Sequence, residues 1–392
     1  MIYRVLGPFD RYNYGDLLFP LILKYKIESL GYQVEFYGLV ESDFTNYGAV
    51  KTLSISNFYS DLSKGDKVII AGGESLCTSW ADLYSYLNKL FDYIYGNRIA
   101  KGIDRRINIF SWLARSICSG QSRYPFAFSP RELKLDVSIS FNAVGGAALN
   151  TWPYKKLHRF VENINDSKLI GVRDNLTYSA LKKIRSEMAV ELVPDSAILM
   201  QRFYSKELDE LKIRKKYKLP EKYIYFQVGN EKYSDLNVIY NELKSLANET
   251  GYAVVLCAIG HALGHEDLKP LQSLHRMSQA DGQNNFIIIS DMLNVFDLMC
   301  LIKESSLYIG TSLHGVITSL SFGVPYVPLN KEIKKVGEYL KEWGVRSLSQ
   351  QCDEDQIVEL GINALKVNSS DIMRDVERQK NIASEFLDRL IE

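Results

Sequence analysis

Short apolar runs recur along the chain, separated by amphipathic segments or by loops that contain glycine. The clearest example starts with a strand pattern at residues 307–309 and continues through a tight turn at 310–312. An apolar-faced helix follows and is predicted to end at Gly323, before a second apolar run at 324–329. A strand, a turn, a helix and a second strand in this order form the building block of a parallel sheet.

The same alternation predicts two α/β domains of parallel strands followed by two C-terminal helices. A chain of 392 residues exceeds one ordinary hydrophobic core, which also favours two domains. We place an N-terminal Rossmann-like domain at 1–204, a second at 205–350 and the helices at 351–392, the last of which could cross back onto the first domain. Strands are expected at 2–7, 33–37, 67–71, 136–141, 168–172, 189–193, 223–228, 253–257 and 285–289, and helices at 16–30, 79–94, 175–184, 235–250 and 295–303.

Composition narrows the possible partners and location. The chain has 47 basic and 47 acidic residues, so no global field would recruit nucleic acid, and no nucleic-acid partner is expected. The five cysteines lack CxxC spacing, so neither a disulfide framework nor a metal site is expected. The first residues lack a signal-peptide pattern, and no apolar run is long enough to span a bilayer. We therefore expect a cytoplasmic protein, whose oligomeric state the sequence leaves open.

Residues 96–134 differ in texture from the rest of the chain. They contain eight Lys or Arg residues against two acidic ones, interleaved with Ile, Phe and Trp. A basic amphipathic segment of this kind can lie on an anionic membrane surface or collect an acidic glycan. It can also be a flexible insertion, or a helix packed on its own domain. Because the apolar residues keep no clean helical period, we favour a flexible insertion or a helix packed on its own domain, with peripheral membrane contact as the alternative.

The candidate chemistry lies in loops that follow the predicted strands. Carboxyl ends of parallel strands meet at one edge of a sheet, where ligands bind. His314 lies in the first turn of its helix, where an imidazole can move protons near neutral pH beside an anion held at the helix N-terminus. The other loop residues are Asn13, Gly15, Asp16, Gly72, Gly73, Glu74, Arg173, Asp195, Gly310, Thr311, Ser312 and Leu313.

Each of these residues also has a purely structural interpretation. His314 could cap its own turn, and Asp16 could be a helix N-cap. Arg173 could form an ordinary salt bridge with Asp174 or Asp195. Glycines after a strand serve plain turns as well as close approach to a ligand.

The order of six short motifs along residues 2–330 resembles the polysaccharide pyruvyl transferase family. No single motif is specific, and their order and spacing carry the resemblance. They are Asn-Tyr-Gly-Asp at 13–16, Val-Ile-Ile-Ala-Gly-Gly at 68–73, Ile-Gly-Val-Arg-Asp at 170–174, Val-Pro-Asp at 193–195, Tyr-Ile-Gly-Thr-Ser-Leu-His at 308–314 and Gly-Val-Pro at 323–325.

This resemblance implies two Rossmann-like domains facing a cleft, similar to GT-B glycosyltransferases. It also implies transfer of the enolpyruvyl part of phosphoenolpyruvate to hydroxyls of a cell-surface glycan or its lipid-linked precursor, which forms a pyruvate ketal. Such chemistry belongs to exopolysaccharide or capsule synthesis at the inner face of the cytoplasmic membrane. Phosphoenolpyruvate is then a substrate, and no separate cofactor is implied.

Adding an alcohol to phosphoenolpyruvate requires an acid that protonates the methylene carbon and a base that removes the hydroxyl proton. We expect His314 to deliver the proton and Asp16 to activate the hydroxyl, with Asn13 orienting it. Arg173 would grip the carboxylate or phosphate of the donor. The remaining loop residues are expected to bind substrate, and they are Gly15, Gly72, Gly73, Glu74, Asp195, Gly310, Thr311, Ser312 and Leu313.

Two positions depart from the family pattern. Ser312 stands where the family usually has arginine, and Glu74 replaces the third glycine of a triplet. Since a hydroxyl does not replace a bidentate cation, Arg173, Lys331 or an arginine of 98–131 could hold the donor instead. Alternatively the donor differs, as in a glycosyltransferase that uses a nucleotide sugar, or the chain is a non-catalytic protein that binds glycan.

Overall fold

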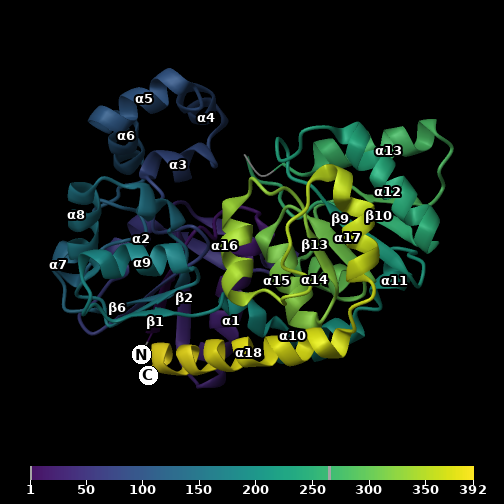
Figure 1. Ribbon diagram of the computed structural model, residues 1–392. Helices are drawn as coiled ribbons and strands as arrows, with labels where there is room; N and C mark the ends of the chain where they lie inside the picture. The colour runs from purple at the N-terminus through teal and green to yellow at the C-terminus, as the bar shows by residue number, and fades with distance from the viewer. Residues whose placement is uncertain (1, 264–265) are drawn as a thin grey trace. The chain divides into compact units, whose positions relative to one another are not determined.

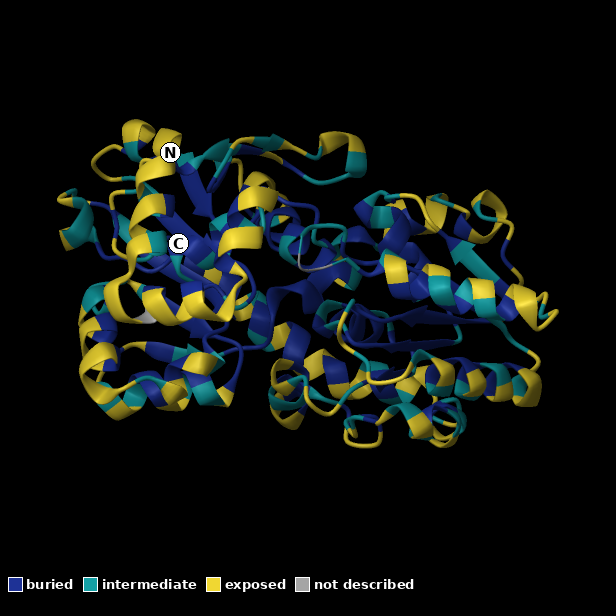
Figure 2. Cartoon of the chain, turned by 90° about the horizontal axis from the view of Figure 1, so that it is seen from above, coloured by how far each residue is buried: buried dark blue, intermediate teal, exposed yellow. Residues whose placement is uncertain are grey.

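The computed structural model describes residues 2–263 and 266–392, and these form two compact units (Figure 1). Within the described ranges, unit 1 comprises residues 2–12, 16–196 and 384–392, and unit 2 comprises residues 13–15 and 197–383. Each unit is built around its own mainly parallel sheet, whose strands are buried (Figure 2). The expected α/β class with two parallel sheets is therefore confirmed.

The sheet of unit 1 has β1 near its centre, and the strand order is β3-β4-β2-β1-β5-β6-β7-β8. All pairs are parallel except β3 with β4. The chain first adds strands on one side of β1 and then returns to add β5 and its successors on the other side. The strands are β1 Ile2–Leu6, β2 Gln33–Gly38, β3 Ser42–Asp43, β4 Lys51–Ser54, β5 Lys67–Ala71, β6 Ser138–Val144, β7 Leu169–Val172 and β8 Val190–Leu192.

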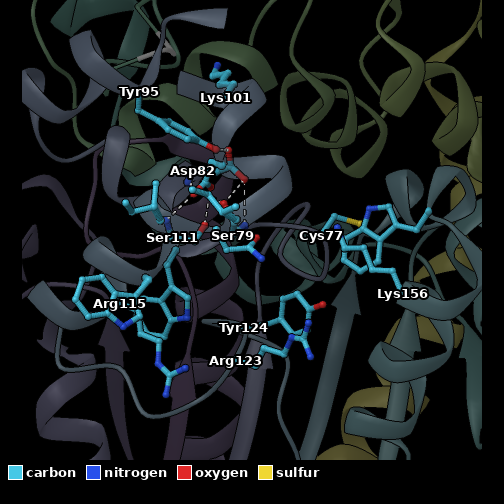
Figure 3. A pocket seen from close by; sticks show the side chains of 17 residues that line it. Cys77, Ser79, Asp82, Tyr95, Lys101, Ser111, Arg115, Arg123, Tyr124 and Lys156 are labelled. Carbon is cyan, nitrogen blue, oxygen red and sulfur yellow. Dashed lines mark hydrogen bonds between the residues drawn. The ribbon is translucent and has the colours of Figure 1, made fainter. Parts of the chain in front are cut away.

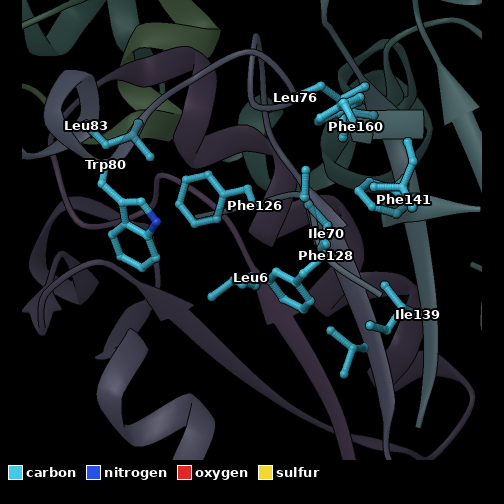
Figure 4. Close-up of a cluster of buried hydrophobic side chains, with 14 of the residues drawn as sticks. Leu6, Ile70, Leu76, Trp80, Leu83, Phe126, Phe128, Ile139, Phe141 and Phe160 are labelled. Atoms are coloured by element: carbon cyan, nitrogen blue, oxygen red, sulfur yellow. The ribbon is translucent and has the colours of Figure 1, made fainter. Parts of the chain in front are cut away.

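Apolar side chains of these strands pack with those of the covering helices (Figure 4). Leu6, Ile70 and Phe141 from three strands join Trp80 and Phe128 in this core, all of them almost fully buried. The helices along this part of the chain are α1 Tyr14–Ser29, α2 Ile55–Asp61, α3 Trp80–Ser85, α4 Lys89–Tyr95, α5 Arg98–Ile107, α6 Ile109–Ile117, α7 Pro130–Leu133, α8 Tyr154–Ile164 and α9 Asn175–Ile184, with the 3₁₀ turns η1 Thr45–Tyr47 and η2 Ala147–Thr151.

Unit 2 repeats the scheme with a parallel sheet of order β11-β10-β9-β12-β13. Here the chain reverses at β9, because β10 and β11 lie on one side of it and β12 and β13 on the other. The strands are β9 Tyr223–Gln227, β10 Ala253–Cys257, β11 Phe286–Ile289, β12 Leu307–Gly310 and β13 Tyr326–Pro328. The helices are η3 Ser196–Leu199, α10 Met200–Glu210, α11 Ile213–Lys216, α12 Leu236–Thr250, α13 Leu268–Ala280, α14 Val295–Lys303, α15 Leu313–Phe322, α16 Lys334–Trp343, η4 Glu354–Gln356, α17 Ile357–Ala364 and α18 Ser369–Ile391.

The boundary between the units differs from the expected division at 204. It falls after Ser196. Residues just after this point are bound to unit 2, because the hydroxyl of Ser321 on α15 donates to the carbonyl of Ile198 and accepts from the N–H of Gln201. The C-terminal helices are no separate domain either. Residues up to 383 belong to unit 2, and residues 384–392 at the end of α18 belong to unit 1, where Phe386 packs on Gly171.

Within segment 96–134, residues 98–107 and 109–117 form helices α5 and α6, although the sequence showed no clean helical period. Asn108, with φ of 53°, separates α5 from α6 in a left-handed conformation. Each helix keeps its own apolar face, and the break shifts the phase between them. The expected single helix at 79–94 is likewise two helices, α3 and α4, because Asn88 caps α4 by accepting from the N–H of Phe91.

No helix in residues 2–263 and 266–392 has both the length and the apolar character needed to cross a membrane.

Candidate functional site

In unit 1, the motif residues gather where the strand order reverses. Strands β1 and β5 are neighbours that lead the chain in opposite directions along the sheet, and open α/β sheets bind their ligands at the carboxyl ends of such strands. Gly72 follows β5 with φ of 119°, and a methyl group there would lie 2.7 Å from Cδ of Pro8 in the loop after β1. Glycine is therefore required at this position.

Asp16 and Arg173 meet beside the second glycine of this loop. A methyl group on Gly73 would lie 3.4 Å from Oδ1 of Asp16 and 3.8 Å from Nη2 of Arg173. Helix α1 begins at Tyr14, so Asp16 stands inside its first turn and is not the N-cap that one interpretation expected. A carboxylate in this turn is favoured by the helix dipole. The fold thus brings Asp16, Gly73 and Arg173 together in unit 1.

Arg173 lies at the carboxyl end of β7 in an ion pair with two acids. Its Nη1 is 2.8 Å from Oδ2 of Asp195, and its Nη2 is 3.3 Å from Oε1 of Glu74. Burial disfavours the cation, but Asp195 and Glu74 outweigh this effect and raise the pKa of Arg173. Its side chain is only 3% exposed, so the salt-bridge interpretation describes the geometry, with Asp195 and Glu74 as partners.

Asp174 has a separate structural task. It caps α9 by accepting from the N–H and the hydroxyl of Thr177. Glu74 also accepts from the N–H of Ala147 at 3.3 Å, and its side chain is 34% exposed. Of the two acids paired with Arg173, Glu74 is therefore the one that solvent or a ligand can reach, because Asp195 is fully buried.

In unit 2, the corresponding reversal lies between β9 and β12. Oε1 of Gln227, at the end of β9, accepts from the N–H groups of Thr311 and Ser312, both at 3.1 Å. The hydroxyl of Thr311 accepts from the N–H of Gly229 at 2.9 Å. Ser312 caps α15 by accepting from the N–H of Gly315. The N–H groups of Thr311 and Ser312, two residues that we expected to bind substrate, are thus occupied by the protein itself.

The imidazole of His314 packs directly on the Asn13–Gly15 segment, which belongs to the same unit. A methyl group on Gly15 would lie 2.0 Å from Nδ1 of His314, closer than any real contact. The segment is held in place by the N–H of Tyr14, which donates to the carbonyl of Ile259, and by a β-bridge between Asn13 and Gly260. The motif 13–16 is thus divided, since Asp16 belongs to unit 1.

Asp267 is the most perturbed carboxyl at this edge of unit 2. Its Oδ2 accepts from Nε2 of Gln227 at 2.8 Å and from the N–H groups of Ile259 and Gly260 at 3.1 and 3.0 Å. Burial raises the pKa of Asp267 to about 6, while these hydrogen bonds and the charge of Lys335 act in the opposite direction. Asp267 thus joins the ends of β9 and β10.

The sequence prediction missed Gln227, Asp267 and Lys335. Gln227 carried one signal, because it is a polar residue that ends an otherwise apolar strand.

Lys331, one of the cations expected to replace the family arginine, instead contacts Asp353 at 2.7 Å. Leu313 and Gly310 are buried, and a methyl group on Gly310 would lie 2.5 Å from the hydroxyl of Tyr308, so both shape the turn.

Solved structures similar to this chain are GT-B-type enzymes. UDP-GlcNAc 2-epimerase from Methanocaldococcus jannaschii matches with a TM-score of 0.55 and 11% identity over 96% of this chain and 98% of that chain. The Neisseria meningitidis enzyme bound to UDP-GlcNAc has a TM-score of 0.55 and 13% identity over 99% of both chains. Trehalose-6-phosphate synthase OtsA matches with a TM-score of 0.52 and 12% identity over 100% of this chain and 97% of that chain. At these identities the likeness defines the fold, which is of the GT-B type.

The family to which this chain belongs follows from its sequence. The family model for polysaccharide pyruvyl transferase matches residues 13–331, so the chain belongs to this family. A search of curated protein sequences finds no significant match. The matched range begins at Asn13 and ends at Lys331, so it contains the motif residues at both strand-order reversals.

We expect Gly15→Ala to displace the imidazole of His314, because the added methyl group would overlap the ring. The shift can be measured as a change in the NMR signals of the His314 ring. Gly102→Ala is the matched control, since a methyl group there meets nothing within 4 Å. Unchanged His314 signals in Gly15→Ala would contradict the packing of the imidazole on Gly15.

We expect Asp267→Asn to stabilise the protein more at pH 8 than at pH 4. The folded-state pKa of about 6 lies above the ordinary value of about 3.9, so the folded state binds more protons between these values. Stability from this group is therefore lost as pH rises through this range, and the asparagine variant avoids the loss. Urea unfolding should show a difference between the two pH values of roughly 2–3 kcal/mol. An equal effect of the substitution at both pH values would contradict the raised pKa of Asp267.

Proposed function

We propose that this protein transfers the pyruvyl group of phosphoenolpyruvate to hydroxyls of a cell-surface glycan or its lipid-linked precursor. Membership of the polysaccharide pyruvyl transferase family supports the transferase class and a saccharide acceptor. The observation that carries the proposal is the position of His314, which lies at the strand-order reversal of unit 2 and packs on Gly15 of the first family motif. The reaction would take place in the cytoplasm, on the inner face of the membrane when the acceptor is lipid-linked.

The addition needs one proton donated to the methylene carbon and one proton removed from the attacking hydroxyl. A proton added to the methylene carbon makes a methyl group and leaves an oxocarbenium ion at the neighbouring carbon. An acceptor hydroxyl attacks that carbon and gives its proton to a base. Phosphate then leaves, a second hydroxyl closes the ketal, and its proton goes to solvent. One phosphoenolpyruvate and one diol thus give one ketal and one phosphate.

We assign the acid to His314 and the base to Asp16. An imidazole can hold and release a proton near neutral pH, and the side chain of His314 is half-buried in the first turn of α15, after the end of β12. Asp16 is also half-buried, and it lies beside Gly73, which has no side chain to block an approach. Asn13 would orient the acceptor hydroxyl.

The donor anion needs a cation in place of the family arginine at position 312. Arg173 is held by Asp195 and Glu74, so its charge is largely offset. Two lysines at the edge of unit 2 are better suited. Lys335 acts electrostatically on Asp267, and Lys232 packs beside Gly229 after β9. Both are exposed, and a flexible ammonium group can follow a phosphate as a point charge.

We expect His314→Ala to lower phosphate release from phosphoenolpyruvate by about 10²–10⁴-fold, the usual loss when a general acid is removed. The assay supplies a lipid-linked saccharide fraction as acceptor, and it measures both phosphate and acid-labile pyruvate on the glycan. His275→Ala is the matched control, because His275 lies on α13 of the same unit outside the motifs. Full activity in His314→Ala would remove this residue from the chemistry.

A further inference from the structure

The strongest unexplained feature is a concentration of exposed apolar side chains on α4, α5 and α6. Of the fourteen exposed large hydrophobic residues in the described chain, ten lie between Leu90 and Ile117. On α5, Ile99, Ile103 and Ile107 recur every four residues and so share one face. The other seven are Leu90, Tyr93, Ile94, Ile109, Trp112, Leu113 and Ile117.

These helices pack on one another and on α3 at one end of unit 1 (Figure 1). Asp104 fixes the turn between α5 and α6 by accepting from the N–H groups of Phe110 at 2.7 Å and Ser111 at 3.1 Å. The apolar face is thus held outward by a buried polar contact. An exposed apolar area of this extent marks an interaction surface.

The charge of this surface is positive. Between residues 89 and 117 there are six Lys or Arg and two Asp, and one of these, Asp104, is buried. Arg98, Lys101 and Arg106 are exposed, and in the part of the chain that the structure describes none of them forms an ion pair with a carboxylate. Basic side chains beside exposed Ile and Trp are the pattern of helices that lie in the interface of an anionic bilayer.

A cavity of about 930 Å³ opens beside this surface (Figure 3). Ile107, Ile109 and Trp112 form part of its wall, and so do the cations Lys101, Arg115, Arg123 and Lys156. Both acids in the wall have other partners, since Asp104 holds α6 and Asp82 accepts from Tyr95 and Ser79. The cavity therefore offers positive charge and aromatic rings next to the apolar surface, which suits a phosphate-bearing headgroup.

We infer that α4–α6 form a membrane-docking surface that inserts its apolar side chains into an anionic lipid bilayer, with the adjoining cavity receiving a phosphate headgroup. The three helices have 7, 10 and 9 residues, so each is too short to span a bilayer and is suited to lie in its interface. The inference goes beyond pyruvyl transfer and does not depend on the donor. It accounts for how a soluble unit reaches a lipid-linked acceptor.

The test is binding of the full chain to vesicles of a zwitterionic lipid, with and without an added anionic phospholipid. We expect co-sedimentation with the anionic vesicles, weakening as salt rises. Trp112 is 65% exposed, whereas Trp80 and Trp343 are 1% and 8% exposed and Trp152 is half-buried, so binding should shift the tryptophan emission to the blue, mainly through Trp112. Trp112→Phe should abolish most of this shift while retaining most of the binding.

Three variants separate the contributions to binding. The triple variant Ile99→Ser, Ile103→Ser and Trp112→Ser should weaken binding roughly tenfold or more. The double variant Arg123→Gln and Lys156→Gln should weaken it roughly thirtyfold on anionic vesicles and leave zwitterionic vesicles unaffected. Leu30→Ser is the matched control, because Leu30 is 50% exposed outside the surface.

Two results would overturn the inference. One is equal binding of wild type and the triple variant to anionic vesicles. The other is a concentration-dependent dimer that the triple variant abolishes while vesicles are not bound, which would assign the surface to a second copy of the chain. Loss of phosphoenolpyruvate turnover with intact vesicle binding would instead count against the proposed reaction alone.

Discussion

Both units depend on a constraint of parallel sheets, namely that their strands all end at the same edge. In each unit the strand order reverses once, between β1 and β5 in unit 1 and between β9 and β12 in unit 2. The chain leaves these neighbouring strands in opposite directions, and open α/β sheets bind their ligands at such positions. The family motifs at 13–16, 68–73 and 308–314 lie at or after the strands of these two positions, whereas those at 170–174 and 193–195 lie at the end of β7 and after β8.

At both edges, much of the polar chemistry serves the protein itself. Arg173 is neutralised by Asp195 and Glu74, and the N–H groups of Thr311 and Ser312 are bound by Gln227. Such contacts hold the loops in one conformation, since an unpaired buried charge or amide would be costly. His314 and Asp16 are half-buried titratable groups of the motifs.

The strands and many helices could be predicted from the sequence, because buried parallel strands are short apolar runs bounded by glycine or polar loops. The segments β10, α9 and α14 begin and end where the pattern indicated. Features that depend on residues distant in the sequence could not be found. Gln227 contacts Asp267 and Thr311 across 40 and 84 positions, and the assignment of Asn13–Gly15 to unit 2 rests on Ile259 and Gly260. The positions of the site residues along the chain were thus predicted from the sequence, whereas the residues that they contact are known only from the structure.

The most direct test is thermal unfolding of the purified protein with phosphoenolpyruvate and, separately, with UDP-sugars, because a ligand that binds only the folded state raises the melting temperature. We predict a rise that saturates with phosphoenolpyruvate and none with the nucleotide sugars. A rise with a UDP-sugar and none with phosphoenolpyruvate would contradict the proposed donor.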